Sequence, residues 1–137
     1  MKKNFNKISS YLVIGFLVFW IIKSMYENFQ FKNDFKITIG QVNKITTPGW
    51  KNSGDYSMIY EYKINGRKYT GNNNYEFCGT ITMQKMSELL VNQYFPVAYS
   101  SKDMAQSSII VTQKSADMFN YKIPDSLLVY DSILSCR

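Results

Sequence analysis

The sequence predicts an α+β protein in which one N-terminal transmembrane helix is followed by a small, mainly antiparallel β-domain. The stretch Tyr11–Ile22 is apolar throughout and carries no charge. The rest of the chain is rich in aromatic and β-branched residues, a composition that favours strands. Asn65-Gly66 stands between two alternating segments, which is typical of a tight β-hairpin. After the helix we expect the order β-β-β-α-β-β.

The apolar stretch is long enough to cross a membrane once its mildly polar flanks are counted. Residues 8–26 form about 28 Å of helix, against a hydrocarbon core of roughly 30 Å. Tyr11, Trp20 and Tyr26 lie towards its ends, where aromatic side chains anchor helices at the membrane interface. A helix buried in a soluble domain would be amphipathic, whereas this one is apolar on every side.

The flanks of this stretch favour an uncleaved signal anchor over a cleaved signal peptide. Cleavage needs small residues at two nearby positions, and residues 23–28 offer only Ser24. Lys2, Lys3 and Lys7 precede the stretch without any acid, which favours a cytoplasmic N-terminus. We therefore expect the C-terminal domain to be extracytoplasmic.

The net charge of +6 follows largely from the anchor and does not indicate a nucleic-acid partner. Residues 1–23 contain lysines and no acid, so the remainder of the chain is closer to neutral. The basic residues of that remainder are scattered, whereas a nucleic-acid surface needs them clustered on one face.

The expected organisation has five parts. Residues 1–7 form a cytoplasmic basic N-terminus, 8–26 the signal anchor, 27–34 a juxtamembrane linker, 35–112 the α+β domain and 113–137 a tail packed on it. Within the domain we expect strands at 35–47, 56–64, 67–71, 97–100 and 107–112, with a helix at 81–93. We expect a β-bulge at Gly40 and a loop at residues 72–74.

Three segments resemble a family of small membrane-anchored domains that is catalogued as a domain of unknown function. They are Gly40-Gln41-Val42, the Tyr-x-Tyr-x-Ile-Asn-Gly-Arg-x-Tyr hairpin at residues 60–69, and Phe-Pro-Val-Ala-Tyr at residues 95–99. The resemblance covers roughly residues 36–112 and implies a small antiparallel β-domain beside a membrane helix. It implies no activity. This chain lacks the glycine and extra residues that the family has after Pro96-Val97, so we expect a shortened fourth strand.

The residue types argue against an enzyme. The chain has no histidine, which removes the commonest general base and the commonest metal ligand. No phosphate-binding loop and no zinc-ligand spacing occurs, so we infer no cofactor, no metal and no small-molecule substrate. Cys78 and Cys136 have three interpretations: free structural thiols, a disulfide, or a catalytic thiol at Cys78 just before a helix.

These observations favour a single-pass, non-enzymatic protein, an accessory or interaction subunit of a membrane or bacterial envelope complex with a protein partner. The exposed edges of a small open sheet are natural docking sites. Trp50 is either a partner contact or a loop residue folded over the core edge. Two other functions stay open: an immunity-type protein that neutralises a toxin at the membrane, and a thiol-dependent enzyme that uses Cys78.

Overall fold

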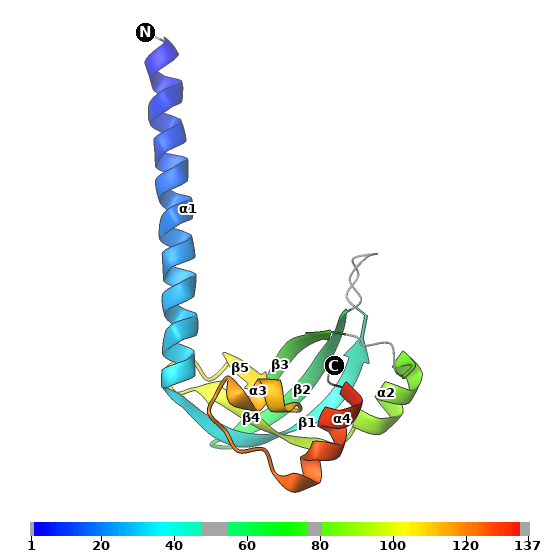
Figure 1. Cartoon of the computed structure of the whole chain (residues 1–137). Helices are drawn as coiled ribbons and strands as arrows, with labels where there is room; N and C mark the ends of the chain where they lie inside the picture. The colour runs from blue at the N-terminus through cyan, green and yellow to red at the C-terminus, as the bar shows by residue number, and fades with distance from the viewer. Residues whose placement is uncertain (1, 48–54, 77–80, 135–137) are drawn as a thin grey trace. The chain divides into compact units, whose positions relative to one another are not determined.

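The computed structural model describes residues 2–47, 55–76 and 81–134. The chain divides into two units, residues 1–33 and residues 34–137. The first is a single helix, and the second is the β-domain with its short helices (Figure 1). An α+β fold with one N-terminal apolar helix is thus confirmed.

The N-terminal helix α1 (Lys2–Asn33) contains one segment that is long and apolar enough to span a membrane. That segment, Tyr11–Asn33, has 23 residues, and no part of its apolar window is buried. At 1.5 Å per residue it is about 34 Å long. A signal sequence near an N-terminus has the same properties. The helix continues through residues 27–33, so the stretch expected as a linker is helical.

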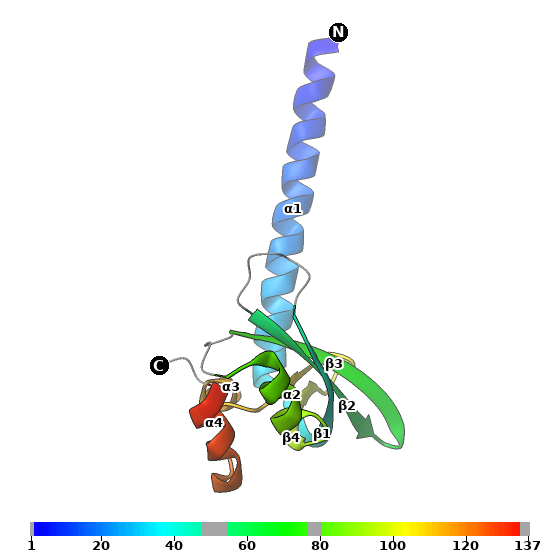
Figure 2. The ribbon, with the colours of Figure 1, turned by 90° about the vertical axis from the view of Figure 1, so that its right-hand side faces the viewer.

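The β-domain is built on five antiparallel strands in the spatial order β3-β2-β1-β4-β5. Their bounds are β1 (Phe35–Thr46), β2 (Asp55–Ile64), β3 (Arg67–Glu76), β4 (Tyr94–Ser100) and β5 (Ser107–Ile109). Helix α2 (Met83–Leu90) connects β3 to β4 and lies beside β1 (Figure 2). The predicted order β-β-β-α-β-β is confirmed. The two edge strands approach each other, so the sheet is nearly a barrel.

The β2–β3 hairpin has the predicted register. Tyr62 pairs with Tyr69 and Ile64 with Arg67, and the turn residues Asn65 and Gly66 have φ of 50° and 79°. Two positive φ values are what a type I′ turn requires. The expected loop at residues 72–74 is wrong, because β3 continues to Glu76 and its residues pair with β2 throughout.

The predicted bulge at Gly40 is also wrong. Gly40 pairs regularly with Tyr62 and Phe95, and the register shifts instead between Val42 and Lys44. Gly40 is needed for space, since a Cβ there would lie 2.6 Å from Cγ2 of Val97.

Two strands and the helix differ in length from the prediction. Strand β4 starts at Tyr94 and is not shortened, whereas β5 ends at Ile109. Thr82 caps α2 by accepting a hydrogen bond from Lys85 N–H. The helix ends at Leu90 because the backbone then turns to β1: Asn92 has a φ of 68° and donates its N–H to Val42 O at 2.7 Å.

The core is dominated by tyrosines of β2. Tyr56, Tyr60 and Tyr62 alternate along the strand and are at most 2% exposed, as period two predicts. The same hydrophobic core includes Met86 and Leu90 of α2. It also includes Leu134, which lies at the end of the last helix, α4 (Leu128–Leu134).

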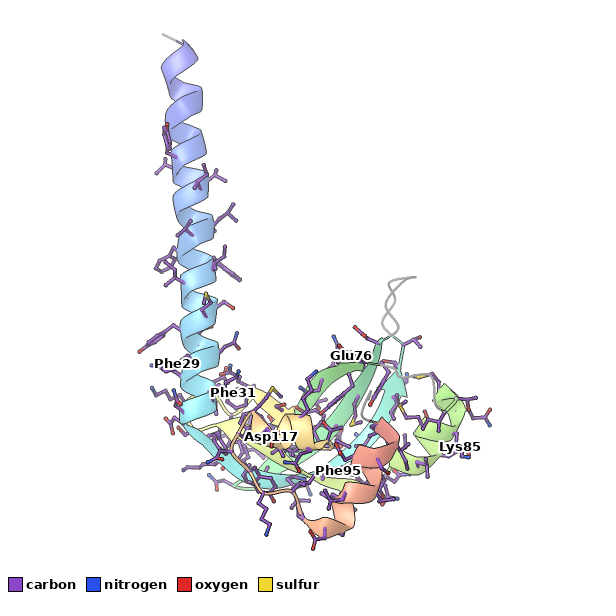
Figure 3. All side chains as sticks on the ribbon, in the orientation of Figure 1. Phe29, Phe31, Glu76, Lys85, Phe95 and Asp117 are labelled. Atoms are coloured by element: carbon purple, nitrogen blue, oxygen red, sulfur yellow. The ribbon has the colours of Figure 1, made fainter. Side chains whose placement is uncertain are left out.

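The tail is helical: α3 (Gln113–Asp117), a 3₁₀ turn η1 (Asp125–Leu127) and α4 (Leu128–Leu134). Tyr130 of α4 meets Phe95 edge to face, with ring centroids 5.1 Å apart. Phe95 is labelled in Figure 3.

The tyrosine core predicts a loss of stability in alkali. Burial raises the pKa of Tyr56, Tyr60, Tyr62 and Tyr75 above the ordinary value. In the unfolded chain these side chains ionise near the ordinary value of about 10, so the folded state retains protons that the unfolded state releases. The stability that these tyrosines contribute is therefore fully present below about pH 10. The free energy of unfolding falls as the pH rises further.

A pH titration of the full chain in mild detergent tests this prediction. Above about pH 10, part of the rise in tyrosinate absorbance should coincide with the loss of near-ultraviolet circular dichroism. The Tyr94→Phe variant is the control, because Tyr94 is 62% exposed and should leave that transition in place. Complete ionisation of all tyrosines with an unchanged circular dichroism signal would contradict the prediction.

Candidate functional site

The edge strands β3 and β5 are joined by side chains instead of a backbone ladder. We call this junction the seam; it comprises Tyr60, Asn73, Tyr75, Ser108 and Ile109. The Asn73 Oδ1 atom accepts hydrogen bonds from Ile109 N–H at 3.1 Å and from Tyr60 OH at 2.8 Å. Its Nδ2 donates to Ser108 Oγ at 3.1 Å, and Tyr75 OH donates to Ile109 O at 2.7 Å. Both backbone groups of Ile109 therefore bind side chains of β3.

Gly71 makes room for this arrangement. The Tyr60 ring crosses the opposite position on β3, and a Cβ on Gly71 would lie 2.3 Å from Tyr60 Cζ. Across that gap the Tyr60 hydroxyl also reaches Ser107 Oγ at 3.1 Å. A side chain at position 71 would displace the Tyr60 ring and break the hydrogen bonds of its hydroxyl with Asn73 and Ser107.

The segment between β4 and β5 closes the sheet further along β3. Tyr62 OH donates to Met104 O at 2.7 Å, and Tyr69 OH lies 3.6 Å from the Met104 sulfur. The rings of Tyr62 and Tyr69 stack with centroids 5.7 Å apart. At these positions the facing edges of the sheet are engaged within the domain, so they do not present the open docking edges that the sequence led us to expect.

A cavity of about 370 Å³ lies beside the seam. Its walls are the end of β3, with Glu76 (Figure 3), together with Ser108, parts of α3 and Leu134. This volume falls in the range of small-molecule sites. The buried Ser115 in its wall is already satisfied: its Oγ accepts from Thr112 N–H at 3.0 Å and donates to Thr112 O at 2.7 Å. The cavity thus combines one acid, Glu76, with one base, Lys114, and hydroxyls that support α3.

One buried hydroxyl in the described part of the chain has no hydrogen-bond partner, that of Tyr56. Its ring stacks on Tyr75 with centroids 5.7 Å apart. Among residues 2–47, 55–76 and 81–134, no group of three or more histidine, cysteine, aspartate or glutamate side chains gathers as metal ligands would.

The sequence-predicted site residues do not meet at one place. Tyr11, Trp20 and Tyr26 all lie on α1 and are 72%, 62% and 60% exposed. Trp50, Cys78 and Cys136 lie outside the described residues.

Asn73, expected in a loop, is a seam residue that the sequence did not single out. A signal for it existed, because Asn73 continues the inward-facing alternation of Tyr69 and Gly71 and precedes Tyr75 by two positions.

No family model, curated protein or solved structure matches this chain. The resemblance to a domain of unknown function therefore stays a prediction.

The hydrogen bonds of Asn73 predict that its substitution lowers the free energy of unfolding, whereas substitution of its neighbour does not. Asn73→Ala removes the acceptor that the buried Tyr60 hydroxyl and the buried Ile109 N–H share. The hydroxyl keeps its contact with Ser107, whereas the N–H loses its partner. An unsatisfied buried group costs about 1–3 kcal/mol, so we expect a loss of about 1–3 kcal/mol in the free energy of unfolding. Urea unfolding in mild detergent, followed by near-ultraviolet circular dichroism, measures this change.

Asn74→Ala is the matched control, since Asn74 is the same residue type one position on and is exposed. Its unfolding curve should stay within about 0.5 kcal/mol of the parent chain. Hydrogen exchange at the Ile109 amide should accelerate only in Asn73→Ala. Equal effects of the two substitutions would refute the role given to the seam.

Cys78 and Cys136 lie outside the described residues, so their interpretation as free thiols or as a disulfide stays a prediction. A mass measurement decides between the two: with a disulfide, the chain from an oxidising compartment is lighter than its reduced form by two hydrogen atoms. The Cys78→Ser variant is the control and should show one reactive thiol, whereas two reactive thiols in the parent chain would rule out the bond.

Proposed function

We propose that this chain is a single-pass membrane protein that acts without catalysis, as an accessory or interaction subunit of a membrane protein complex. Its N-terminus lies in the cytoplasm and its β-domain outside. The observation that carries this proposal is α1, whose segment Tyr11–Asn33 is long and apolar, with no part of its apolar window buried.

The exposure of α1 supports a membrane environment. Leu12, Val13, Ile14 and Ile22 lie on four different sides of the helix, and each is more than half exposed. In water such a surface is unfavourable on every side, whereas in hydrocarbon it needs no partner. The core cluster of the β-domain is built from residues between Val42 and Leu134, so α1 is not one of its components.

The binding role is supported by the way the polar side chains of the domain are used. The amide of Asn73 and the hydroxyls of Tyr62, Tyr75 and Ser115 are all engaged in holding strands and helix ends together. The absence of histidine from the sequence points the same way. A domain of this kind acts through its surface while the anchor holds it at the membrane.

Purification of the tagged full chain from native membranes in mild detergent tests the proposal. Mass spectrometry should identify a membrane protein partner in constant ratio to the chain. A matched control replaces residues 11–22 with leucine and alanine, which keeps an anchor of the same length. A chain that elutes repeatedly as a lone monomer would contradict the accessory role.

A further inference from the structure

The outer face of the sheet carries an uncovered apolar strip. We define the outer strip as Ile37 and Ile39 of β1 with Tyr94 of β4, which are 37%, 58% and 62% exposed. Ile39 pairs with Pro96, and Tyr94 lies two positions before Pro96 on the same strand. Because side chains alternate along a strand, all three residues project from the face opposite the tyrosine core.

The neighbouring part of this face is covered by the chain itself. Pro96 and Ala98, the pairing partners of Ile39 and Ile37, are buried. Phe35, two positions before Ile37, meets Phe119 edge to face with centroids 5.1 Å apart. The segment after α3 therefore covers the start of the outer face. The strip is the part of this apolar surface that the described chain leaves open.

Basic side chains border the strip. Lys63 lies on β2 beside β1, where its carbonyl accepts a hydrogen bond from Thr38 Oγ1 at 3.3 Å. Lys63 faces Lys68 across the β2–β3 hairpin. The nearby carboxylate of Glu61 forms an ion pair with Lys68. Lys36 precedes Ile37 by one position on β1, so its side chain projects from the opposite face. Lys63 is exposed and shares the outer face with Ile39, so it is available for an anionic partner.

The chain keeps this strip close to the end of α1. Helix α1 ends at Asn33 and β1 begins at Phe35. At no more than about 3.6 Å per residue, Ile37 lies within about 14 Å of the helix end and Ile39 within about 22 Å. The 23-residue segment Tyr11–Asn33 is about 34 Å long, so as a membrane span it reaches the headgroup layer.

We propose that the outer strip rests on an anionic lipid surface, with Ile37, Ile39 and Tyr94 in the headgroup layer and Lys63 against the lipid phosphates. This inference rests on the membrane anchoring proposed above.

The chemistry of the strip fits a lipid surface. Aliphatic side chains with a tyrosine and flanking lysines form the combination that settles at the boundary between headgroups and acyl chains. Three apolar side chains are a small contact for a free protein. A short tether, however, gives an effective concentration in the mM range, so a weak contact is enough.

Tryptophan fluorescence in vesicles tests the proposal with the full chain. Trp20→Phe and Trp50→Phe remove the native tryptophans, and Ile39→Trp or Tyr94→Trp places a single probe in the strip. The chain is reconstituted in vesicles of phosphatidylcholine with brominated acyl chains. One set of vesicles also contains phosphatidylglycerol, and the other does not. We expect about a twofold loss of emission from either strip probe in the anionic vesicles, and a smaller loss when Lys63→Glu is added.

Two controls separate this proposal from the membrane anchoring on which it rests. Val129→Trp in the same background places the probe on α4, where Val129 is 55% exposed and outside the strip, and it should stay unquenched. The chain with Trp50→Phe alone retains Trp20 and reports insertion of α1. If the Trp20 emission is quenched and neither strip probe is, the outer-strip proposal is overturned and the anchor stands.

The remaining outcomes are equally decisive. The emission maximum of a strip tryptophan could shift to shorter wavelength as the protein density in the vesicles rises, without quenching by brominated lipid. That result would show that a second copy of the chain covers the strip, and it would overturn the proposal. A Trp20 signal that brominated lipid never quenches would refute the anchoring itself and the inference with it.

Discussion

The β-domain depends on the hydrogen bonds by which Asn73 joins its two edge strands. A sheet of five strands leaves two edges with unpaired backbone groups, and unpaired groups in a dry interior are costly. Strand β5 has only three residues, and its Ile109 is fully buried. The Asn73 amide and the Tyr75 hydroxyl satisfy the N–H and the carbonyl of Ile109, so they do the work of a missing backbone ladder.

This constraint explains why tyrosine fills the core. A phenylalanine ring would pack as well, but it would leave the polar groups of the facing segment without partners. Four tyrosines of the β2–β3 hairpin place hydroxyls against residues 104–109: Tyr60, Tyr62, Tyr69 and Tyr75. Their rings supply the apolar volume, and their hydroxyls close the barrel. Gly71 has no side chain because the Tyr60 ring occupies that space.

The near-closure of the sheet limits which of its edges a partner could reach. The facing parts of β3 and β5 are engaged with each other, so they are not open to a partner. On the outer face of the sheet, the part near Phe119 is covered by the chain itself. The uncovered part carries Ile39 and Tyr94 beside lysines. The same strand β1 follows the membrane-helix candidate directly in the chain.

The sequence by itself determined the elements whose signals lie within a few residues. The apolar stretch from Tyr11, the Asn65-Gly66 turn and the Thr82 cap were predictable because each acts on neighbours in the chain. Only the tertiary structure decided the rest. Asn73 looks like a loop residue until Ile109, 36 positions away, is brought beside it. Gly40 looks like a bulge until Val97 is packed against it. Contacts between residues so distant in sequence depend on how the sheet curls closed, and no local pattern encodes that closure.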